Sequence, residues 1–577
     1  MKSLLIDSTD SRYGPILKME NGISIGYKLP EESDLNGDFV NIDTFISNGS
    51  ASIISQIASC NIDYYIIPLS LTTTPLDFSG IRLAQHIRLT QSLSEKRFLP
   101  IIFVSWMDPL HIIKLADGGD MITASGNHLC KPHKDEIDKV VSGGLNSCNI
   151  ATDKINISSH NQSSSHHSTA NEWSILTLSQ ALGLNEKIKE QIDYFRAQLY
   201  FKYLLAKVEI PAVSISSIPN FNLTGQAQKI LFIDDEYQKG WDEIFTKIFS
   251  NQVNIGYSCY KPAKQFTDFE TSDELVDDIE KTILSYDPDI ILLDLRLHDE
   301  DFEKDKTADD MTGLKILKKI KEKINPGLQV IAITASNKVW NLLELQNRGI
   351  DGFILKISPE NEITTVSYNF FENLKYELRK ATERSFLKKI AIETKMIKEH
   401  LTSISSVGGG GGLMALAKLK LKNEVIIQLD QAFELLKGSF KNDLNFSWSF
   451  LSYYKIYELL NDYYIEYNPT NKQLVFRDTG AVIESCQYNN AYSFAAQAVW
   501  DPYKTSTSLK IYNILKKLSF DITRDVSHIA LARKIYSYQL TRKKFIHPDN
   551  LADYQKMRKE DCLEINQTLG KIFPRIV

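Results

Sequence analysis

The stretch "DIILLDLRL", residues 289–297, places an unbroken aliphatic run directly before a single carboxylate, that of Asp294. A short continuous apolar run of this kind predicts a strand that is buried on both faces. Burying a carboxylate without a partner costs several kcal/mol, so the carboxylate does not belong inside such a strand. We therefore expect Asp294 to lie at the end of the strand, where polar groups can reach it.

Similar apolar runs flank this stretch on both sides, and each is followed by residues with helical periodicity. They are "KILFIDDEY" (229–237), "QVIAITASN" (329–337) and "DGFILKISP" (351–359). This alternation predicts a parallel sheet with helices on both faces, in which ligands bind beyond the carboxyl ends of the strands. We expect one crevice to collect the polar residues at these strand ends: Asp234, Asp235, Asp294, Thr334 and Lys356.

The residue types at these strand ends have a joint chemistry. Three carboxylates repel one another unless a hard cation lies among them, and Mg²⁺ prefers oxygen ligands. With Mg²⁺ bound, Asp294 can act as a nucleophile toward a phosphoryl group. Lys356 can pair with one phosphoryl oxygen, and the Thr334 hydroxyl can donate to another. The pattern predicts a phosphorylation site at Asp294 with Mg²⁺ as its cofactor.

This ordered set resembles the receiver domain of two-component response regulators, over about residues 227–365. The resemblance implies that a sensor histidine kinase or a phosphotransfer protein donates the phosphoryl group. It also implies that the backbone carbonyl of Arg296 binds the metal and that Phe353 is the aromatic residue that turns inward on phosphorylation. Two departures stand out. Ile357 takes the place of a common proline, and the polar segment between Asp294 and Gly313 is long enough to predict a mobile flap.

The same spacing recurs near the start of the chain, and the acceptor position there is Pro68. The matching stretches are "SLLIDSTD" (3–10), "YYIIPLSL" (64–71), "PIIFVSWMD" (100–108) and "HLCKP" (128–132). Proline has no carboxylate, so no acyl phosphate can form at this position. We interpret residues 1–142 as a pseudo-receiver that serves dimerisation or docking. An unrelated α/β domain whose strands align by chance is the alternative.

The remaining segments follow from composition and periodicity. Residues 143–170 are rich in Ser, Asn and Gly and predict a flexible linker. We expect a helical connector at 171–225, the receiver at 226–365, a long connector helix at 366–404 and a glycine-rich hinge at 405–413. The connector helix carries an apolar stripe that needs a partner surface, either a second chain in a coiled coil or the following domain.

Residues 414–577 are mostly helical in pattern and form the expected effector domain. Arg542 and His547 lie where one predicted helix ends and another begins. This pair resembles the Arg-x4-6-His motif of HEPN helical domains, many of which are ribonucleases that act as homodimers. The resemblance implies RNA as a substrate, whereas Lys543 departs from the small polar residue common in that family. Arg542 and His547 on a solvated helix end, and a DNA-binding output, are the alternatives.

Composition narrows the class of protein. The net charge is −6, but residues 504–575 carry 15 Lys and Arg against 7 Asp and Glu, so the basic C-terminal end and the acidic remainder of the chain suggest different partners. Six scattered cysteines and the lack of a long apolar run favour a cytoplasmic protein without a membrane partner. The expected fold is multidomain, with two flavodoxin-like doubly wound domains and an all-α effector. The expected function is a phosphorylation-dependent, homodimeric response regulator; the alternative is a non-enzymatic signalling adaptor whose helical C-terminus binds protein or nucleic acid.

Overall fold

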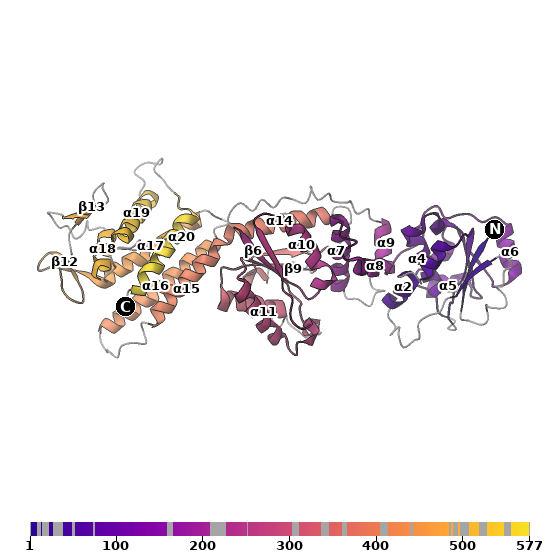
Figure 1. Ribbon diagram of the computed structural model, residues 1–577, viewed down its shortest axis with the longest axis horizontal. Coiled ribbons are helices and arrows are strands. Elements are labelled where there is room, and N and C mark those ends of the chain that lie inside the picture. Colours follow the sequence, from indigo (N-terminus) through magenta and orange to yellow (C-terminus); the bar gives the residue numbers. More distant parts are fainter. Residues whose placement is uncertain are drawn as a thin grey trace.

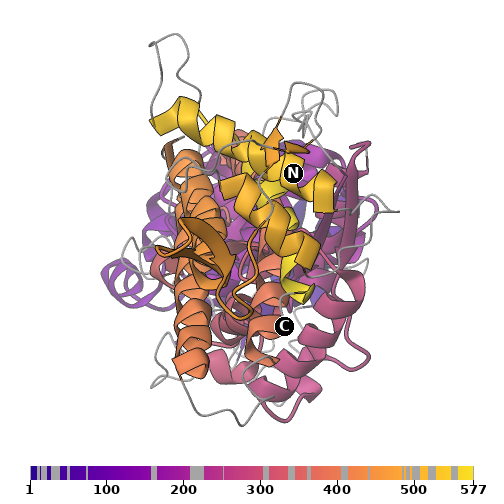
Figure 2. The ribbon, with the colours of Figure 1, turned by 90° about the vertical axis from the view of Figure 1, so that its left-hand side faces the viewer.

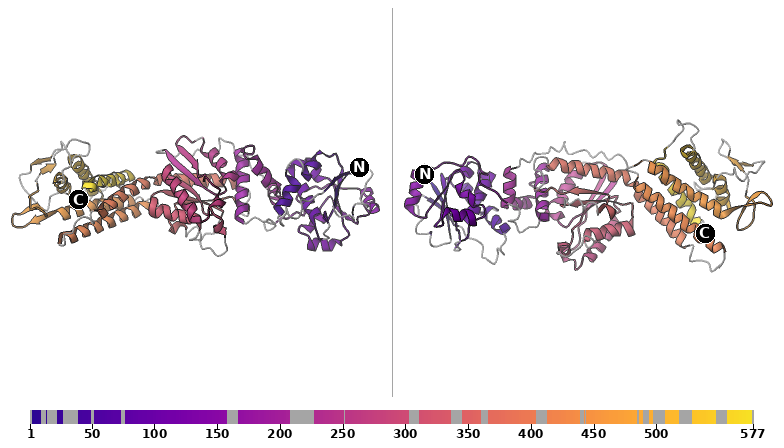
Figure 3. Two further views of the ribbon diagram at one scale, coloured as in Figure 1. Left: turned by 60° about the horizontal axis from the view of Figure 1, so that its bottom comes forward. Right: turned by 180° about the vertical axis from the view of Figure 1, so that it is seen from behind.

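The computed structural model of the chain contains two α/β domains, three connecting helices and a C-terminal helical domain, arranged in a row (Figure 1). The same order is seen from two further directions in Figure 3, and Figure 2 looks along the row from the helical end. The described residues are 2–8, 13, 22–26, 39–48, 52–72, 76–157, 166–207, 227–250, 252–302, 311–335, 345–359, 366–403, 413–438, 442, 444–483, 486–488, 494–496, 507–517, 528–546 and 556–575.

The N-terminal domain is built on a five-stranded parallel sheet with the order β2-β1-β3-β4-β5. Its strands are β1 (Ser3–Asp7), β2 (Gly22–Gly26), β3 (Tyr64–Pro68), β4 (Ile101–Val104) and β5 (Asn127–Cys130). Its α-helices are α2 (Phe39–Ser47), α3 (Ile53–Ser59), α4 (Ser79–Leu89), α5 (Pro109–Leu115) and α6 (Lys134–Ser142). The four apolar runs of the first repeat all form strands, whereas β2 was not among the predicted strands. This strand order is that of flavodoxin-like sheets.

The second α/β domain repeats this order in the sheet β10-β9-β8-β6-β7, which is also parallel throughout. Its strands are β6 (Gln228–Ile233), β7 (Ile255–Cys259), β8 (Ile290–Asp294), β9 (Gln329–Thr334) and β10 (Gly352–Leu355). Its α-helices are α10 (Trp241–Phe249), α11 (Ser272–Tyr286), α12 (Thr312–Lys319) and α14 (Val366–Arg384). Figure 1 shows α10 and α14 on one side of the sheet and α11 on the other. Two receiver-like parallel sheets are therefore confirmed.

A matching glycine marks the same position in both domains. Gly80 N–H donates to Leu69 O at 3.0 Å, and Gly313 N–H donates to Leu295 O at 3.1 Å. An added Cβ would lie 2.0 Å from the carbonyl oxygen of Pro68 in the first domain and 2.6 Å from that of Asp294 in the second. Each helix thus begins so close to the preceding strand end that only glycine fits. The shared geometry supports the internal repeat seen in the sequence.

The segment between the two domains differs from the predicted flexible linker at 143–170. Cys148 N–H donates to Phe98 O at 2.8 Å, and Ile155 is buried in the hydrophobic core. Residues 158–165 lie outside the described residues. Three helices follow: α7 (His166–Leu182), α8 (Lys189–Ala197) and α9 (Leu199–Lys207). One hydrophobic core runs from the first sheet through these helices to the second sheet, so the connector is packed along its described length.

The predicted connector helix at 366–404 is divided into α14 and α15 (Phe386–Ser403), with Ser385 between them. Leu374 on α14 belongs to the core of the second domain, whereas Ile390 on α15 belongs to the core of the helical domain. The single apolar stripe in the sequence therefore serves two cores, and the following domain is the partner surface of α15. The predicted hinge at 405–413 falls almost wholly outside the described residues.

The C-terminal domain packs α15 with further helices around a separate core. These helices are α16 (Leu413–Lys437), α17 (Leu444–Tyr464), α18 (Thr507–Lys517), α19 (His528–Ile546) and α20 (Lys559–Ile572). Two short antiparallel pairs accompany them: β11 (Ile465–Asn468) with β12 (Gln473–Phe476), and β13 (Cys486–Tyr488) with β14 (Phe494–Ala496). In the described part of the chain, no helix is both long and apolar enough to cross a membrane.

A buried polar network fixes α9 to the N-terminal domain. Lys202 Nζ donates to Ser47 Oγ and Thr90 Oγ1, both at 2.7 Å, and lies 3.2 Å from His86 Nδ1. On the opposite side of the ring, His86 Nε2 lies 2.8 Å from Asp43 Oδ1. A neutral imidazole with its proton on Nε2 satisfies both contacts, because Nδ1 then accepts and Nε2 donates.

Acid is expected to weaken this network. Burial lowers the pKa of His86 to about 4, even though the Asp43 carboxylate opposes the shift, and the nearby Lys202 and Arg82 cations disfavour the protonated ring further. Between pH 6.5 and 4 the unfolded chain therefore binds a proton that the folded chain does not. We expect the N-terminal domain to lose about 3 kcal/mol of stability over this interval. Hydrogen exchange of α4 in the full chain measures the loss.

The matched variants for this prediction are His86→Gln and His111→Gln. A glutamine side chain does not titrate, so the His86→Gln chain should show a flatter dependence of α4 exchange stability on pH. His111 is exposed, and its replacement should leave the dependence unchanged. A pH dependence that survives His86→Gln in full would assign the acid sensitivity to other groups.

Candidate functional site

The acidic residues predicted at the strand ends lie together at the carboxyl edge of the second sheet. Asp234 directly follows β6, and Asp294 is the last residue of β8, the strand beside it. Asp235 completes a group whose ligand oxygens all lie within 4.8 Å of one another. Among the described residues this is the only group of three or more acidic, His or Cys side chains arranged closely enough to hold a metal ion.

Lys356 joins this group from the end of β10. Its Nζ donates to Asp294 Oδ2 at 2.6 Å and to Asp234 Oδ2 at 3.2 Å. All three side chains are at least 98% buried, so these are charge-assisted hydrogen bonds shielded from water. The other oxygen of Asp294, Oδ1, accepts the N–H of Leu295 at 2.6 Å. The carboxylate is thus fixed in orientation from two sides.

The charges in this acidic cluster, Asp234, Asp235 and Asp294 with Lys356, do not balance. Burial raises the pKa of Asp234 to about 7, with a further contribution from the Asp294 carboxylate and opposition from the Lys356 ammonium. Burial also raises the pKa of Asp235 well above its usual range, and both neighbouring aspartates add to the shift. Burial alone would lower the pKa of Lys356, but the carboxylates of Asp234 and Asp294 outweigh burial and raise it. One ammonium faces three carboxylates.

This donor set fits a hard divalent cation. Asp234, Asp235 and Asp294 supply carboxylate oxygens, which are the ligands that Mg²⁺ prefers. A divalent cation would also offset the two negative charges that Lys356 leaves uncompensated, so the raised carboxylate pKa values are a physical signature of the fit. The predicted backbone ligand, Arg296, lies two residues beyond Asp294, and its N–H donates to Asp294 Oδ1 at 3.4 Å.

The structure also places the other residues predicted for this site. Thr334 is the buried last residue of β9, and its carbonyl accepts the N–H of Lys356 at 2.8 Å. Phe353 lies on β10 opposite Ala332, half-buried against the core of the domain. Residues 336–344, which follow Thr334, lie outside the described residues.

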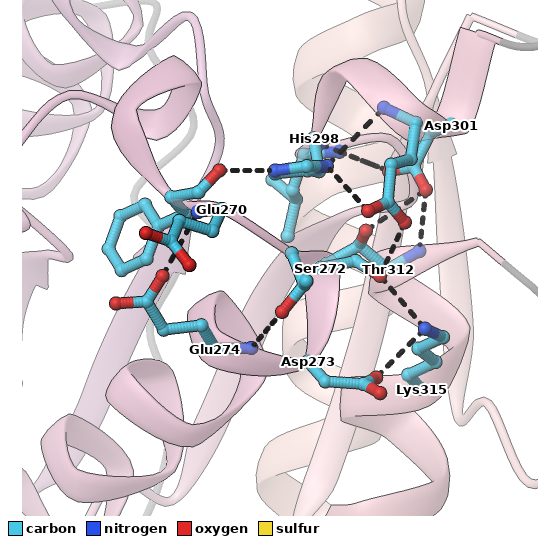
Figure 4. A network of polar contacts seen from close by, with 12 residues as sticks. Glu270, Ser272, Asp273, Glu274, His298, Asp301, Thr312 and Lys315 are labelled. Atoms are coloured by element: carbon cyan, nitrogen blue, oxygen red, sulfur yellow. Dashed lines mark hydrogen bonds and ion pairs between the residues drawn. The ribbon is translucent and has the colours of Figure 1, made fainter.

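Asp301, which the sequence reasoning missed, organises the loop after the acceptor strand. Its Oδ2 accepts the N–H groups of Leu297 at 2.8 Å and His298 at 3.1 Å. Its Oδ1 accepts both the N–H and the hydroxyl of Thr312 at 2.9 Å (Figure 4). Both described ends of the polar insertion are therefore tied down, which differs from a flap that is free from Asp294 onward. The middle, residues 303–310, lies outside the described residues.

The N-terminal domain contains the same arrangement, an aspartate clamp in which one carboxylate accepts four hydrogen bonds from the strand end and the start of the next helix. Asp77 accepts the N–H groups of Leu71 at 3.1 Å and Thr72 at 2.9 Å, and the N–H and hydroxyl of Ser79 at 3.0 and 2.7 Å. The two acceptors of this pattern, Asp77 and Asp301, stand at equivalent places relative to their strand ends and helix starts. The sequence signal for this arrangement is an acid shortly before Ser-Gly or Thr-Gly at the start of the next helix. In the second domain the insertion separates Asp301 from Thr312, which conceals the signal.

The site itself is not repeated in the N-terminal domain. Pro68 is the buried residue at the end of β3, and Lys131 is exposed rather than drawn into a pocket. Asp7 is exposed as well, and Ser8 donates from its hydroxyl to Ser70 O at 3.0 Å. Equivalent positions thus form the buried ion cluster in one domain only.

Helix α7 is anchored beside the acidic cluster by two polar contacts. Ile357 N–H donates to Ser174 Oγ at 2.7 Å, and that hydroxyl lies 3.1 Å from Ile357 O. Trp241 Nε1 donates to Asn171 Oδ1 at 2.7 Å, and the Trp241 ring centre lies 5.4 Å from Lys356 Nζ. A proline at position 357 would have no N–H to donate. The isoleucine that replaces the common proline therefore supplies the N–H that binds Ser174 on α7.

We expect Asn171→Ala to lower the stability of the second α/β domain by about 2 kcal/mol, because the buried Trp241 N–H would lose its acceptor. Hydrogen exchange of α10 in the full chain measures the effect. Gln180→Ala is the control, since Gln180 is an amide on the same helix whose side chain makes no recorded polar contact within the described residues, and its loss should cost no more than about 0.5 kcal/mol. Equal effects of the two changes would show that the Asn171–Trp241 contact contributes nothing specific.

The predicted ribonuclease pair is described only in part. His547 lies outside the described residues. Arg542, near the end of α19, lies 3.3 Å from Glu458 Oε1 and 5.1 Å from the centre of the Tyr454 ring. These contacts hold the guanidinium against α17 of the same chain. A helical C-terminal region is confirmed, and a HEPN-type domain is not.

A family model and several solved structures match parts of the chain. Residues 18–130 match the family described as iREC, Inactive Receiver domain. No curated protein matches the chain. Solved structures of NtrX from Brucella abortus are similar at low identity. The complex with ADP has 19% sequence identity and a TM-score of 0.20, and the match covers 35% of this chain and 34% of that chain. The complex with ATP has 17% sequence identity and a TM-score of 0.21, and the match covers 37% of this chain and 40% of that chain. The chain thus spans about a third of the NtrX chain in the ADP complex, and residues 18–130 are similar to inactive receiver domains.

Proposed function

We propose that the second α/β domain is a phosphoryl-accepting receiver of two-component signalling, with Asp294 as the acceptor and Mg²⁺ as the cofactor. The observation that carries the proposal is the group formed by the buried Asp234 and Asp294 and the half-buried Asp235 beside Lys356, at the carboxyl edge of a parallel sheet. The N-terminal inactive receiver domain, which has Pro68 at the equivalent position, is the companion expected of such a protein.

The chain's own groups would act on the phosphoryl donor as follows. An oxygen of Asp294 attacks the phosphorus, an O–P bond forms, and the bond from phosphorus to the donor's leaving atom breaks with both electrons on that atom. The Lys356 ammonium already donates to this carboxylate, and after transfer it can donate to a negatively charged oxygen of the bound phosphoryl group. Thr334 lies at the end of the neighbouring strand and can donate its hydroxyl to another oxygen. Mg²⁺, when bound by the three aspartates, supplies charge neutralisation for the incoming phosphoryl group.

The route from the acceptor to the rest of the chain begins at β10. Transfer of the Lys356 contact from the carboxylates to a phosphoryl group would shift the end of this strand, and the next residue, Ile357, holds α7 through Ser174. We propose that the C-terminal helical domain is the output that responds, through α14 and α15. We propose a sensor histidine kinase or a phosphotransfer protein as the phosphoryl donor. We also propose that the protein is a cytoplasmic homodimer and that RNA is a target of the C-terminal domain. An adaptor that binds protein or nucleic acid without catalysis is the alternative output.

The test is phosphorylation of the full chain by labelled acetyl phosphate. We expect uptake that requires Mg²⁺, and we expect Asp294→Asn to reduce it at least 100-fold, because an amide cannot form an acyl phosphate. Asp299→Asn, at an exposed acid five residues further on, is the control and should leave uptake unchanged. Equal uptake by the wild-type and Asp294→Asn chains would overturn the proposal.

A further inference from the structure

A cavity of about 990 Å³ lies between the N-terminal domain and the connecting helices, far along the chain from the acidic pocket. Its walls come from the ends of α2 and α4, the start of α3, Gln180 near the end of α7, and residues of α8 and α9. This volume is at the upper end of the range for small-molecule sites, about 300–1,000 Å³. Seven of the sixteen lining residues carry hydroxyl or amide groups: Ser47, Asn48, Ser55, Thr90, Gln91, Ser92 and Gln180.

The cavity is positively charged. Arg196, Lys202 and Lys207 line it, and Asp193 is the only acidic residue among the described lining residues. Asp193 is itself paired with Lys189 at 3.5 Å, so its charge is already offset. Burial lowers the pKa of Lys202 to about 7, so Arg196 and Lys207 supply the positive charge that faces an occupant of the cavity.

Arg196 is the clearest sign of a missing partner. Its side chain is half-buried, yet within the described ranges it has no recorded hydrogen bond or ion pair. Gln180, Asn48 and Ser92 line the same cavity, and their side chains also make no recorded polar contact with described residues. A planar guanidinium presents five donors in a fork that matches the oxygens of a phosphate group. An anion with further hydroxyl groups would satisfy this set.

The opposite wall is held by hydrogen bonds at Lys202. Lys202 is held by Ser47 and Thr90, which fixes its ammonium and both hydroxyls before any ligand arrives. Lys207 lies 4.2 Å from the centre of the Tyr203 ring. Groups that are fixed in advance lose little conformational entropy on binding, so they add more to affinity than mobile surface cations.

We propose that this cavity binds a small phosphorylated sugar or polyol, with Arg196 as the principal phosphate ligand. The charge excess selects the phosphate, and the hydroxyl and amide lining fits the remaining hydroxyl groups. No aromatic side chain occurs among the described lining residues, so a nucleobase would find no stacking partner. The site is independent of the proposed phosphorylation of Asp294. It lies against α7, the helix whose Ser174 contacts Ile357, so the ligand would bind where the two α/β domains are joined.

The test is calorimetric titration of the full chain with ribose 5-phosphate in EDTA, which keeps Mg²⁺ out of the acidic pocket. We expect binding that is at least tenfold tighter than that of inorganic phosphate and of unphosphorylated ribose. Arg196→Gln should weaken the binding of ribose 5-phosphate at least tenfold. The variant should keep its fold, because within the described residues the Arg196 side chain makes no polar contact that the change would remove. Arg379→Gln removes the same charge from an exposed position on α14 and should leave binding unchanged.

Three results would overturn the proposal. Absence of binding by ribose 5-phosphate would show that the cavity is not a site for this class. Equal binding by the wild-type and Arg196→Gln chains would place the ligand elsewhere. Tighter, Arg196-dependent binding of adenosine 5′-phosphate than of ribose 5-phosphate would show that the base is recognised and that the ligand class is wrong. None of these results depends on whether Asp294 accepts a phosphoryl group.

Discussion

Lys356→Ala is expected to lower the stability of the second α/β domain by about 3–5 kcal/mol in EDTA, because two buried carboxylates would lose their shared ammonium. Asp234 and Asp294 would then have to take up protons or draw in water. Mg²⁺ should restore more stability to the variant than to the wild-type chain, since the cation would replace the lost charge. Hydrogen exchange of β8 in the full chain, with and without Mg²⁺, measures both effects.

The N-terminal repeat offers the matched control. Lys131 occupies the equivalent place in sequence but is exposed, so Lys131→Ala should change the stability of its domain by no more than about 0.5 kcal/mol. If Lys356→Ala were equally mild, the ion cluster would contribute nothing measurable to the fold, and its role as a charged pocket would lose its main physical support.

Asp301→Ala is expected to cost about 3–5 kcal/mol, because four buried donors would lose one charged acceptor at the same time. The loop that follows Asp294 would loosen, and the start of α12 would lose its anchor. We therefore expect slower phosphorylation by acetyl phosphate in addition to the lost stability. Hydrogen exchange of α12 and the rate of label uptake measure the two consequences.

Asp77→Ala separates the structural part of this effect from the functional part. Asp77 accepts four equivalent hydrogen bonds in the N-terminal domain, so a stability loss of similar size, about 3–5 kcal/mol, is expected there. Label uptake at Asp294 should be unaffected by that change. A large loss for Asp301→Ala with none for Asp77→Ala would contradict the equivalence of the two clamps.

The strands and the acid group were accessible from the sequence because their signals are local. A short aliphatic run ending in an acid specifies both a buried strand and the position of its last side chain. "DIILLDLRL" (289–297) therefore predicted β8 and the place of Asp294 at its end. Four apolar runs in a fixed order, two of them ending in an acid, also fix which strand ends meet, which is why Lys356 and Asp234 were expected together across 122 residues.

Other features depend on contacts that no local pattern encodes. The break at Ser385 follows from packing against two separate cores, while the apolar stripe itself continues through α14 and α15. Asp301 was hidden because the insertion separates it from Thr312, although Asp77 and Ser79 show the same relation at close range. The contact of Ser174 with Ile357 joins residues 183 positions apart, and a serine inside a helix carries no sign of such a partner.

The most direct test of the central claim, that Asp294 is the residue phosphorylated, is chemical trapping of the acyl phosphate. The full chain is incubated with acetyl phosphate and Mg²⁺, reduced with borohydride, and analysed by mass spectrometry of its peptides. Borohydride converts an aspartyl phosphate to homoserine, so we expect homoserine at position 294 and aspartate at 234, 235 and 299. Homoserine at another position, or none at all, would contradict the assignment of Asp294 as the acceptor.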